Sequence, residues 1–246
     1  MADRVAVVTG ASSGIGEATA RALAREGYAV ALAARREERI GELAEQISSD
    51  GGKAVAIPTD VAHQPSAAAL IQRTKDELGS VDVLVNNAGV MLLGPVLGAD
   101  IEHWQRMVNV NVLGLMYCTH AALPVMQQQG RGHIINVSSV AGRTAGMGSG
   151  AYNATKWAVG AFSESLRQEA VDYNVRVTII EPGFVDTELQ AHNENPLVLE
   201  RIEKDREQMG KVLEAGDIAD AIVYAVTRPE HVSINEVLVR PTRQRR

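Results

Sequence analysis

Short apolar runs alternate with longer amphipathic stretches along almost the whole of this chain. Seven runs have the length and β-branched content of strands, at residues 4–10, 28–35, 53–60, 81–89, 132–139, 175–183 and 234–241. The first six are apolar almost throughout, which predicts central strands that are covered on both faces. Repeated strand–helix–strand units predict an α/β fold, a single doubly wound domain over residues 1–246 with a seven-stranded, mostly parallel sheet and helices on both faces.

Composition limits the partners that such a domain can have. The formal net charge of −6 and the 46% hydrophobic residues are ordinary for a soluble globular protein, and the acidic balance argues against a nucleic-acid partner. The basic segment RPTRQRR at the C-terminus is interpreted as a solvated tail. The single Cys118, in an apolar run, predicts a small buried residue and a reducing compartment. Because no run reaches about 18 apolar residues and no leader pattern is seen, we expect no membrane partner and a cytoplasmic location.

A glycine-rich segment, TGASSGIG at 9–16, directly follows the first run. Gly10, Gly14 and Gly16 give the spacing G-x-x-x-G-x-G. A turn without a Cβ lets the backbone approach a pyrophosphate group, and a helix start offers N–H groups to an anion. Between a strand and a helix, this pattern predicts a dinucleotide site in a Rossmann-type domain; a glycine-rich turn without a ligand is the alternative.

The end of the second run indicates which dinucleotide binds. A protein that prefers NAD usually has a carboxylate here, whereas this chain has Arg35 and Arg36 and no acid until Glu37. A guanidinium can bind a 2′-phosphate through two parallel hydrogen bonds, so the sequence predicts NADP(H). The alternative is that both arginines belong to the solvated first turn of the next helix. Asp60 and Val61, at the end of the third run, are weaker candidates for contacts with the adenine.

The segment YNATK places Tyr152 and Lys156 about one turn apart on one face of a helix. The pKa of tyrosine is near 10, and an ammonium one turn away, together with an oxidised nicotinamide ring, would favour the phenolate and lower that pKa. Tyr152 could then exchange a proton with a carbonyl or alcohol oxygen as hydride moves, while Ser138 or Ser139 hydrogen-bonds the same oxygen. Such a spacing arises by chance in roughly one chain in ten of this composition. Its place after the fifth run, opposite the glycine segment, makes chance a poor explanation.

These motifs together resemble the short-chain dehydrogenase/reductase family over essentially the whole chain. The matching pieces are TGASSGIG, NNAG at 86–89, Asn111 in NVNVLG, SS at 138–139, YNATK at 152–156 and EPGFVDT at 181–187, in the order of the family. The resemblance selects Ser139, thirteen residues before the tyrosine, over Ser138. It implies four catalytic residues: Asn111, Ser139, Tyr152 and Lys156. In this family Lys156 would also bind the nicotinamide ribose, and Asn111 would hold a water that continues a proton relay.

Motifs and resemblance together give a set of expected cofactor contacts. These are Gly10, Ser12, Ser13, Gly14, Ile15, Gly16, Arg35, Arg36, Asp60, Val61, Asn87, Ala88, Gly89, Tyr152, Lys156, Pro182, Gly183, Val185 and Thr187. The resemblance implies that residues 87–89 line the floor beneath the cofactor and that residues 182–187 position its carboxamide. None of the six histidines has a metal-ligand partner at helical spacing, so no catalytic metal is expected.

The substrate is less well defined by the sequence. ARRxER and the closing segment NEVLVRPTRQRR, in place of a glycine-rich ending, resemble the NADP-dependent branch that oxidises 3-hydroxy acids and serine. MLLGPV at 91–96 and SESLRQE resemble the branch that reduces clavulanate-9-aldehyde, the clavulanate dehydrogenases. Both imply a small polar aldehyde or a 3-oxo or 3-hydroxy acid. The polar segment 188–212 is interpreted as a lid. The candidate substrate residues are Met91, Arg143, Met147 and His192, of which Arg143 and His192 would be cations that meet a carboxylate, with a surface role as the alternative.

The sequence therefore predicts an NADP(H)-dependent oxidoreductase that interconverts a small carbonyl compound and an alcohol by hydride transfer. Amphipathic patterns at 100–129 and 150–173 are typical of helices that pair between subunits, and the resemblance implies a homotetramer or a homodimer. A non-catalytic NADP-binding sensor on the same fold is the main alternative, which the loss of Tyr152 or Lys156 would have favoured. An epimerase or dehydratase would need a second hydride or acid–base device, and the sequence offers none that we can identify.

Overall fold

The computed structural model describes residues 4–245. The strands are β1 (Val5–Thr9), β2 (Ala29–Ala34), β3 (Lys53–Pro58), β4 (Val83–Asn86), β5 (Gly132–Val137), β6 (Val175–Pro182) and β7 (Glu236–Val239). The helices are α1 (Gly14–Arg25), α2 (Glu37–Ser49), α3 (Gln64–Leu78), α4 (Ile101–Val108), α5 (Leu115–Gln129), α6 (Gly150–Ala170), α7 (Pro196–Met209) and α8 (Ala215–Val226). Each strand falls inside one of the apolar runs of the sequence.

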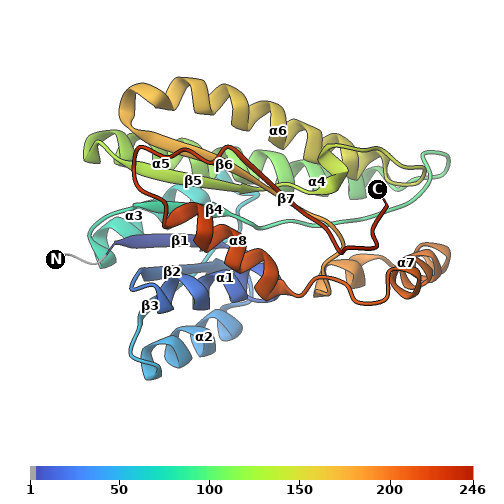
Figure 1. The fold of residues 1–246 in the computed structure, drawn as a ribbon, viewed down its shortest axis with the longest axis horizontal. Helices are drawn as coiled ribbons and strands as arrows, with labels where there is room; N and C mark the ends of the chain where they lie inside the picture. Colours follow the sequence, from blue (N-terminus) through green and yellow to red (C-terminus); the bar gives the residue numbers. More distant parts are fainter. Residues whose placement is uncertain (1–3, 246) are drawn as a thin grey trace.

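The seven strands form one sheet in the order β3-β2-β1-β4-β5-β6-β7, and every pair of neighbours is parallel (Figure 1). This confirms the doubly wound α/β fold. The strand order reverses between β1 and β4, so the carboxyl ends of all strands meet at one edge with a crevice at the reversal. The expectation that β3 is a central strand is wrong: it lies at the edge of the sheet, and Lys53 and Pro58 are exposed.

Helices cover both faces of the sheet. On one face, apolar side chains of α1, α2 and α8 pack on the strands, among them Leu23, Ile40 and Ile222. On the other face α3, α5 and α6 do so, and this layer includes Cys118. Burial raises the pKa of Cys118 to about 12, so its thiol stays protonated and packs as the small hydrophobic group that the sequence predicted.

The helix from Ile101 to Gln129 is continuous through α4, a π-helical turn at Asn109–Gly114, and α5. In the described part of the chain it alone is long and apolar enough, by length and composition, to cross a membrane, whereas the sequence had suggested no such stretch. Core helices of soluble proteins meet the same criterion, and α5 packs Ala122 and Met126 against the sheet. Buried residues make up 33% of its most apolar window, and Tyr117 and Leu123 of α5 are partly buried against the same layer.

Close packing at the reversal point fixes the start of α1. A Cβ on Gly16 would lie 2.2 Å from the carbonyl oxygen of Gly10 and 2.6 Å from the amide nitrogen of the Asn87 side chain. No side chain fits there, because real Cβ atoms do not approach other heavy atoms to less than 3.0 Å. The third glycine of the motif is therefore required by the contact of α1 with the ends of β1 and β4.

We expect Gly16→Ala to lower the free energy of unfolding by about 1 to 3 kcal/mol, because the added methyl group forces the glycine segment away from β4. Gly41→Ala in α2 is the matched control, since a Cβ there meets nothing within 4 Å. The control should raise stability by about 0.5 to 1 kcal/mol, the ordinary gain for alanine over glycine in a helix. Urea denaturation measures both, and an equal effect of the two substitutions would contradict the close approach.

Candidate active site

The carboxyl ends of the strands surround a cavity of ≈ 570 Å³. Most residues predicted from the sequence line it: Gly10, Ser12, Ser13, Gly14, Ile15, Arg35, Arg36, Asp60, Val61, Asn87, Ala88, Gly89, Met91, Ser139, Tyr152, Lys156, Pro182, Gly183, Val185, Thr187 and His192. Gly16 and Asn111 lie behind the wall, where they support it. Arg143 and Met147 are not among the lining residues. The structure thus brings the two halves of the predicted site together in one cavity.

The glycine segment fits a pyrophosphate group. Gly10 and Gly14 have positive φ angles of 67° and 55°, a conformation that favours glycine. A Cβ on Gly14 would lie 3.1 Å from the side chain of Thr187, so a side chain here would narrow the gap between the two loops. The intrahelical bonds of α1 begin with the N–H of Glu17, which donates to Ser13. The start of α1 therefore offers its N–H groups and its dipole to an anion.

Arg36 turns back over the glycine segment. Its guanidinium donates to the hydroxyl groups of Ser12, at 3.0 Å, and Ser13, at 2.6 Å, and to the carboxylate of Glu188, at 2.7 Å. Glu188 also accepts from Arg39 at 2.7 Å. Hydrogen bonds from Arg39 and Arg36 hold the pKa of Glu188 at about 2, so it is ionised. Arg36 is thus part of the cavity wall as well as the start of α2, and the alternative of a purely solvated turn does not describe it.

At the other end of the cavity, α6 presents Tyr152 and Lys156 on one face. The ammonium of Lys156 lies 5.8 Å from the centre of the Tyr152 ring and donates to the carbonyl of Val137 at 3.0 Å. Ser139 lies close enough to the Tyr152 hydroxyl to lower its pKa, and its own hydroxyl donates to the carbonyl of Pro182 at 3.4 Å. Ser138 instead donates to the main-chain carbonyl of Lys156 at 3.1 Å. Both serines line the cavity, and Ser138 also connects α6 to β5; the choice of Ser139 as the catalytic serine stays a prediction.

Burial shifts the pKa values of Tyr152 and Lys156 in opposite directions, and each shift favours the neutral form of the side chain. Burial raises the pKa of Tyr152 to about 12, against a smaller lowering by the nearby Ser139 side chain. Burial lowers the pKa of Lys156 to about 8. The lowering of the Tyr152 pKa that the sequence predicts depends on the ammonium together with an oxidised nicotinamide ring, and it stays a prediction; among the protein groups, desolvation of the phenolate outweighs the effect of Ser139.

Asn111 lies in the π-helical turn, which widens the long helix locally and places this side chain on its buried side. The amide of Asn111 accepts the N–H of Val90 at 2.8 Å and donates to the carbonyl of Val90 at 2.9 Å. It also donates to the hydroxyl of Thr155 at 3.2 Å, and that hydroxyl donates to the carbonyl of Tyr152. Asn111 therefore joins the floor of the cavity after β4 to the first turn of α6.

A second asparagine holds the loop between β5 and α6. Asn153 donates to the carbonyls of Ala141 and Thr144, both at 2.7 Å, and the Ser149 hydroxyl donates to the Asn153 amide at 2.6 Å. This side chain is buried next to Tyr152 in sequence and fixes the loop that carries Ser139. Sequence reasoning missed it, although its place inside the YNATK motif was the available signal.

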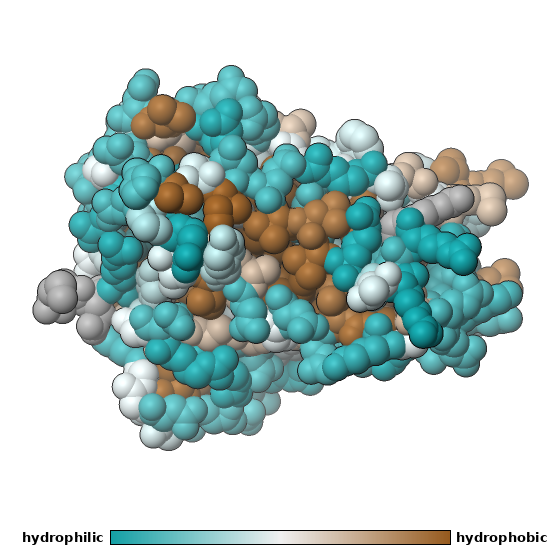
Figure 2. Space-filling view, viewed as in Figure 1, coloured by the Kyte–Doolittle hydropathy of each residue, from teal (hydrophilic) through white to brown (hydrophobic). Residues whose placement is uncertain are grey.

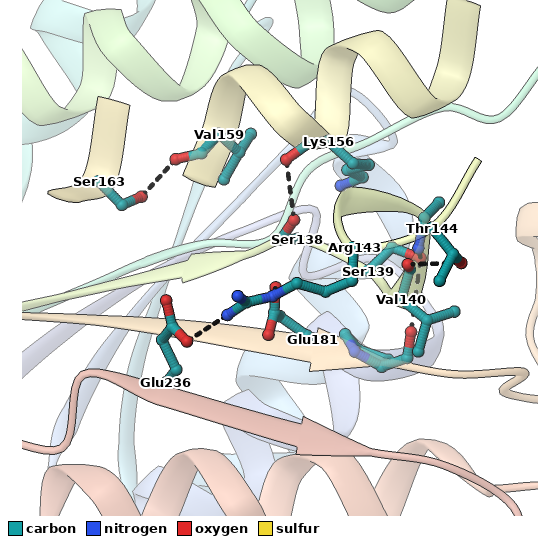
Figure 3. A network of polar contacts seen from close by, with 12 residues as sticks. Ser138, Ser139, Val140, Arg143, Thr144, Lys156, Val159, Ser163, Glu181 and Glu236 are labelled. Carbon is teal, nitrogen blue, oxygen red and sulfur yellow. Dashed lines mark hydrogen bonds and ion pairs between the residues drawn. The ribbon is translucent and has the colours of Figure 1, made fainter. Parts of the chain in front are cut away.

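Arg143 does not face the cavity. Figure 3 shows its guanidinium between the carboxylates of Glu181, at 2.7 Å, and Glu236. Glu181 is buried at the end of β6, so its charge needs this cation. Arg143 is thereby engaged in joining the loop after β5 to β6 and β7, which corrects the expectation that it meets a substrate carboxylate. Met147 is exposed at the loop tip, where its carbonyl accepts from Arg201.

The segment 188–212 borders the cavity as a helical turn, Glu188–His192, followed by α7. Figure 1 shows α7 projecting at one end of the molecule, with the segment after β7 running toward it. His192 lines the cavity, and burial with nearby arginines lowers its pKa, so at neutral pH it is uncharged and not the cation that the sequence suggested. Its buried Nδ1 atom has no hydrogen-bond partner among the described residues. Ile202 and Asp205 of α7 also line the cavity.

The C-terminal segment is not simply a solvated tail. Pro241 is buried, and the amide oxygen of Gln244 accepts the N–H of Phe184 at 2.9 Å. A Cβ on Gly183 would lie 2.2 Å from that oxygen. Gln244 therefore rests on the loop after β6 and lines the cavity, a contact for which the sequence gave no signal. Within residues 4–245, no group of three or more histidine, cysteine or acidic side chains is placed to hold a metal ion.

A doubly wound parallel sheet with a glycine-lined cavity at its switch point defines a dinucleotide-binding protein. The short chain dehydrogenase family matches residues 4–197. An uncharacterized oxidoreductase of Staphylococcus aureus (strain USA300) is 42% identical over 241 residues, which is 98% of each chain.

Two solved structures resemble the whole chain. An alcohol dehydrogenase from the archaeon Thermococcus sibiricus, complexed with 5-hydroxy-NADP, has a TM-score of 0.88 and 31% identity, over 99% of this chain and 98% of that one. The closed form of serine dehydrogenase complexed with NADP+ has a TM-score of 0.89 and 34% identity, over 98% of this chain and 96% of that one. The chain therefore belongs to the short-chain dehydrogenase/reductase family and is an oxidoreductase.

The lowered pKa of Lys156 predicts how stability depends on pH. The folded protein releases the Lys156 proton near pH 8, whereas the unfolded chain keeps it until about pH 10.5. In this window the unfolded chain binds more protons, so the free energy of unfolding rises with pH. Between about pH 7 and pH 10 the wild type should gain on the order of 2 kcal/mol relative to Lys156→Met. Urea denaturation at each pH measures this, and a difference independent of pH would contradict the buried lysine.

Proposed function

We propose that this oxidoreductase uses NADP(H) to interconvert an aldehyde or ketone and an alcohol by hydride transfer. The observation that carries the proposal is that Tyr152, Lys156 and Ser139 meet in the same cavity that begins at the glycine segment. A proton donor and a cation buried beside a dinucleotide site suit a reaction in which a carbonyl oxygen gains negative charge. The sensor alternative has no observation in its favour, since all the chemical groups are present.

In this proposal each residue has a defined task. Bound NADPH supplies the hydride, or NADP accepts it in the reverse direction. Ser139 donates a hydrogen bond to the carbonyl oxygen, and Tyr152 gives that oxygen its proton or removes it from the alcohol. Lys156 holds the ribose hydroxyls and favours the phenolate when Tyr152 has lost its proton. Asn111 positions the first turn of α6 and continues the proton path toward solvent.

The preference for NADP(H) over NAD(H) rests on Arg35 and Arg36. Both arginines line the cavity next to the glycine segment, with the hydroxyls of Ser12 and Ser13 beside Arg36. Two cations and two hydroxyl donors suit a 2′-phosphate group. The two solved structures described above contain NADP or an NADP derivative, which supports the same choice.

The proposed substrate is a small polar aldehyde or a 3-oxo or 3-hydroxy acid, with clavulanate-9-aldehyde as one example. The similarity to serine dehydrogenase supports this class. The cavity wall includes apolar Met91 and Ile202 as well as polar Ser149 and His192. In this proposal 188–212 acts as a lid, and the uncharged His192 hydrogen-bonds a substrate oxygen or hydroxyl.

We further propose a homotetramer, with a homodimer as the simpler alternative. Large apolar side chains are exposed on the two long helices, among them Ile101, Val108 and Trp157, and Val171 is exposed directly after α6. Tyr224 on α8 and Leu238 on β7 are also exposed, and Figure 2 shows apolar side chains gathered on the face where β7 forms the sheet edge. Two such surfaces on different sides of the chain suit two kinds of subunit contact.

Tyr152→Phe tests the chemistry. It should lower kcat by at least about a hundredfold, the ordinary range for loss of a general acid, while NADPH affinity changes little because the ring remains. Turnover is followed as nicotinamide absorbance on a panel of aldehydes, 3-oxo acids and 3-hydroxy acids. A fully active variant would contradict the mechanism. A wild type that turns over no compound in the panel would favour the non-catalytic NADP-binding sensor.

Arg36→Ala tests the cofactor choice. We expect the wild type to bind NADPH more tightly than NADH, and the variant to lose about tenfold or more of its NADPH affinity with little change for NADH, because only NADPH carries the 2′-phosphate. Nicotinamide fluorescence on titration gives both dissociation constants. Tighter binding of NADH by the wild type would overturn the proposed preference.

A further inference from the structure

The guanidinium of Arg36 already holds an anion of the protein itself. Its three nitrogen atoms donate to Ser12, Ser13 and Glu188, so the carboxylate lies in direct contact with the group that a 2′-phosphate would use. Glu188 lies 152 positions further along the chain, in the turn that opens the segment 188–212. The ion pair therefore connects the adenosine end of the cavity to the first residue of the lid.

A carboxylate and a phosphate cannot share this guanidinium without cost. Arg36 and Glu188 are both about half exposed, which leaves room for a ligand, and Glu188 lines the cavity. A 2′-phosphate bound by Arg36 would stand within about 5 Å of an ionised carboxylate, where like charges repel by one to several kcal/mol at the dielectric constants of protein surfaces. The repulsion concerns NADP(H) and not NAD(H), which has only hydroxyl groups at the ribose.

Arg39 gives Glu188 a second place to bind. It contacts the other carboxylate oxygen at 2.7 Å and does not line the cavity. A side chain with two arginine partners can leave one of them and stay ionised on the other. Glu188 can thus move off Arg36 without losing all of its compensating charge.

We propose that Glu188 is a cofactor-specificity residue, whose carboxylate competes with the 2′-phosphate of NADP(H) for Arg36 and so weakens the preference that Arg36 creates. This inference rests on the proposed use of Arg36 for the phosphate. NADP(H) binding displaces Glu188 onto Arg39 and rearranges the first turn of the lid, whereas NAD(H) leaves the Arg36–Glu188 pair in place. The lid is thereby coupled to the identity of the cofactor.

Fragments of the two cofactors test the competition without any catalytic turnover. Calorimetry compares 2′,5′-ADP, which carries the phosphate, with 5′-AMP, which does not. Glu188→Gln keeps the size of the side chain and removes its charge, so the variant should bind 2′,5′-ADP about tenfold more tightly and 5′-AMP within about twofold of the wild type. A weaker affinity for 2′,5′-ADP, or an equal change for both fragments, would overturn the inference.

Two further variants separate the possible failures. Glu37→Gln is the control, because it removes the same charge from the residue next to Arg36. The Glu37 side chain is exposed and, in the described residues, forms no ion pair, so the affinities for 2′,5′-ADP and 5′-AMP should each change less than twofold. A tenfold gain in this control would show a general charge effect and contradict the competition. If Arg36→Ala leaves 2′,5′-ADP binding unchanged, the proposed phosphate site and this inference both fail. If Arg36→Ala weakens it while Glu188→Gln has no effect, only this inference fails.

Discussion

The hydrogen bonds between Thr9 and Asn87 join β1 to β4 at the point where the strand order reverses, and the rest of the site depends on them. The Thr9 hydroxyl accepts the N–H groups of Asn87 and Ala88 and donates to the carbonyl of Val85. The Asn87 side chain donates to the carbonyl of Thr9 in return. The end of β1, where the glycine segment begins, is thus fixed to the end of β4, where the cavity floor begins. Because Gly16 packs on the same Asn87 side chain and on the carbonyl of Gly10, α1 is oriented by the same contact.

The chemical end is held by side chains that bond to the main chain of neighbouring elements. Lys156 and Ser138 connect α6 to the end of β5, and Asn111 connects it through Thr155 to the segment after β4. Asn153 fixes the loop that carries Ser139. Buried polar groups need such partners, so these bonds stabilise the fold and also set where the Tyr152 hydroxyl lies. Position and stability come from the same contacts at this site.

The sequence predicted what depends on local pattern and failed where distant segments meet. Apolar runs and motif order were enough for the sheet, the glycine segment and the Tyr152–Lys156 pair, since parallel strands must end at one edge. Strand order was not predictable, so β3 was expected to be central. Arg143 could not be assigned to Glu181, nor Arg36 to Glu188, because each pair joins loops whose relative position only the fold determines. The hydrogen bond between Gln244 and Phe184 also joins segments that are distant in the sequence, so it could not be predicted either.

The protonation states of Tyr152 and Lys156 bear on the direction of the proposed reaction. With a pKa of about 12, Tyr152 carries its proton at neutral pH, as a group that donates to a carbonyl oxygen must. In the proposed mechanism, removal of a proton from an alcohol needs the phenolate, which desolvation disfavours and which Ser139 stabilises only in part. The pKa of Lys156, about 8, lies close enough to neutral pH that its charge is itself variable. In the proposed mechanism, carbonyl reduction thus starts with Tyr152 already protonated, whereas alcohol oxidation requires Tyr152 first to lose its proton.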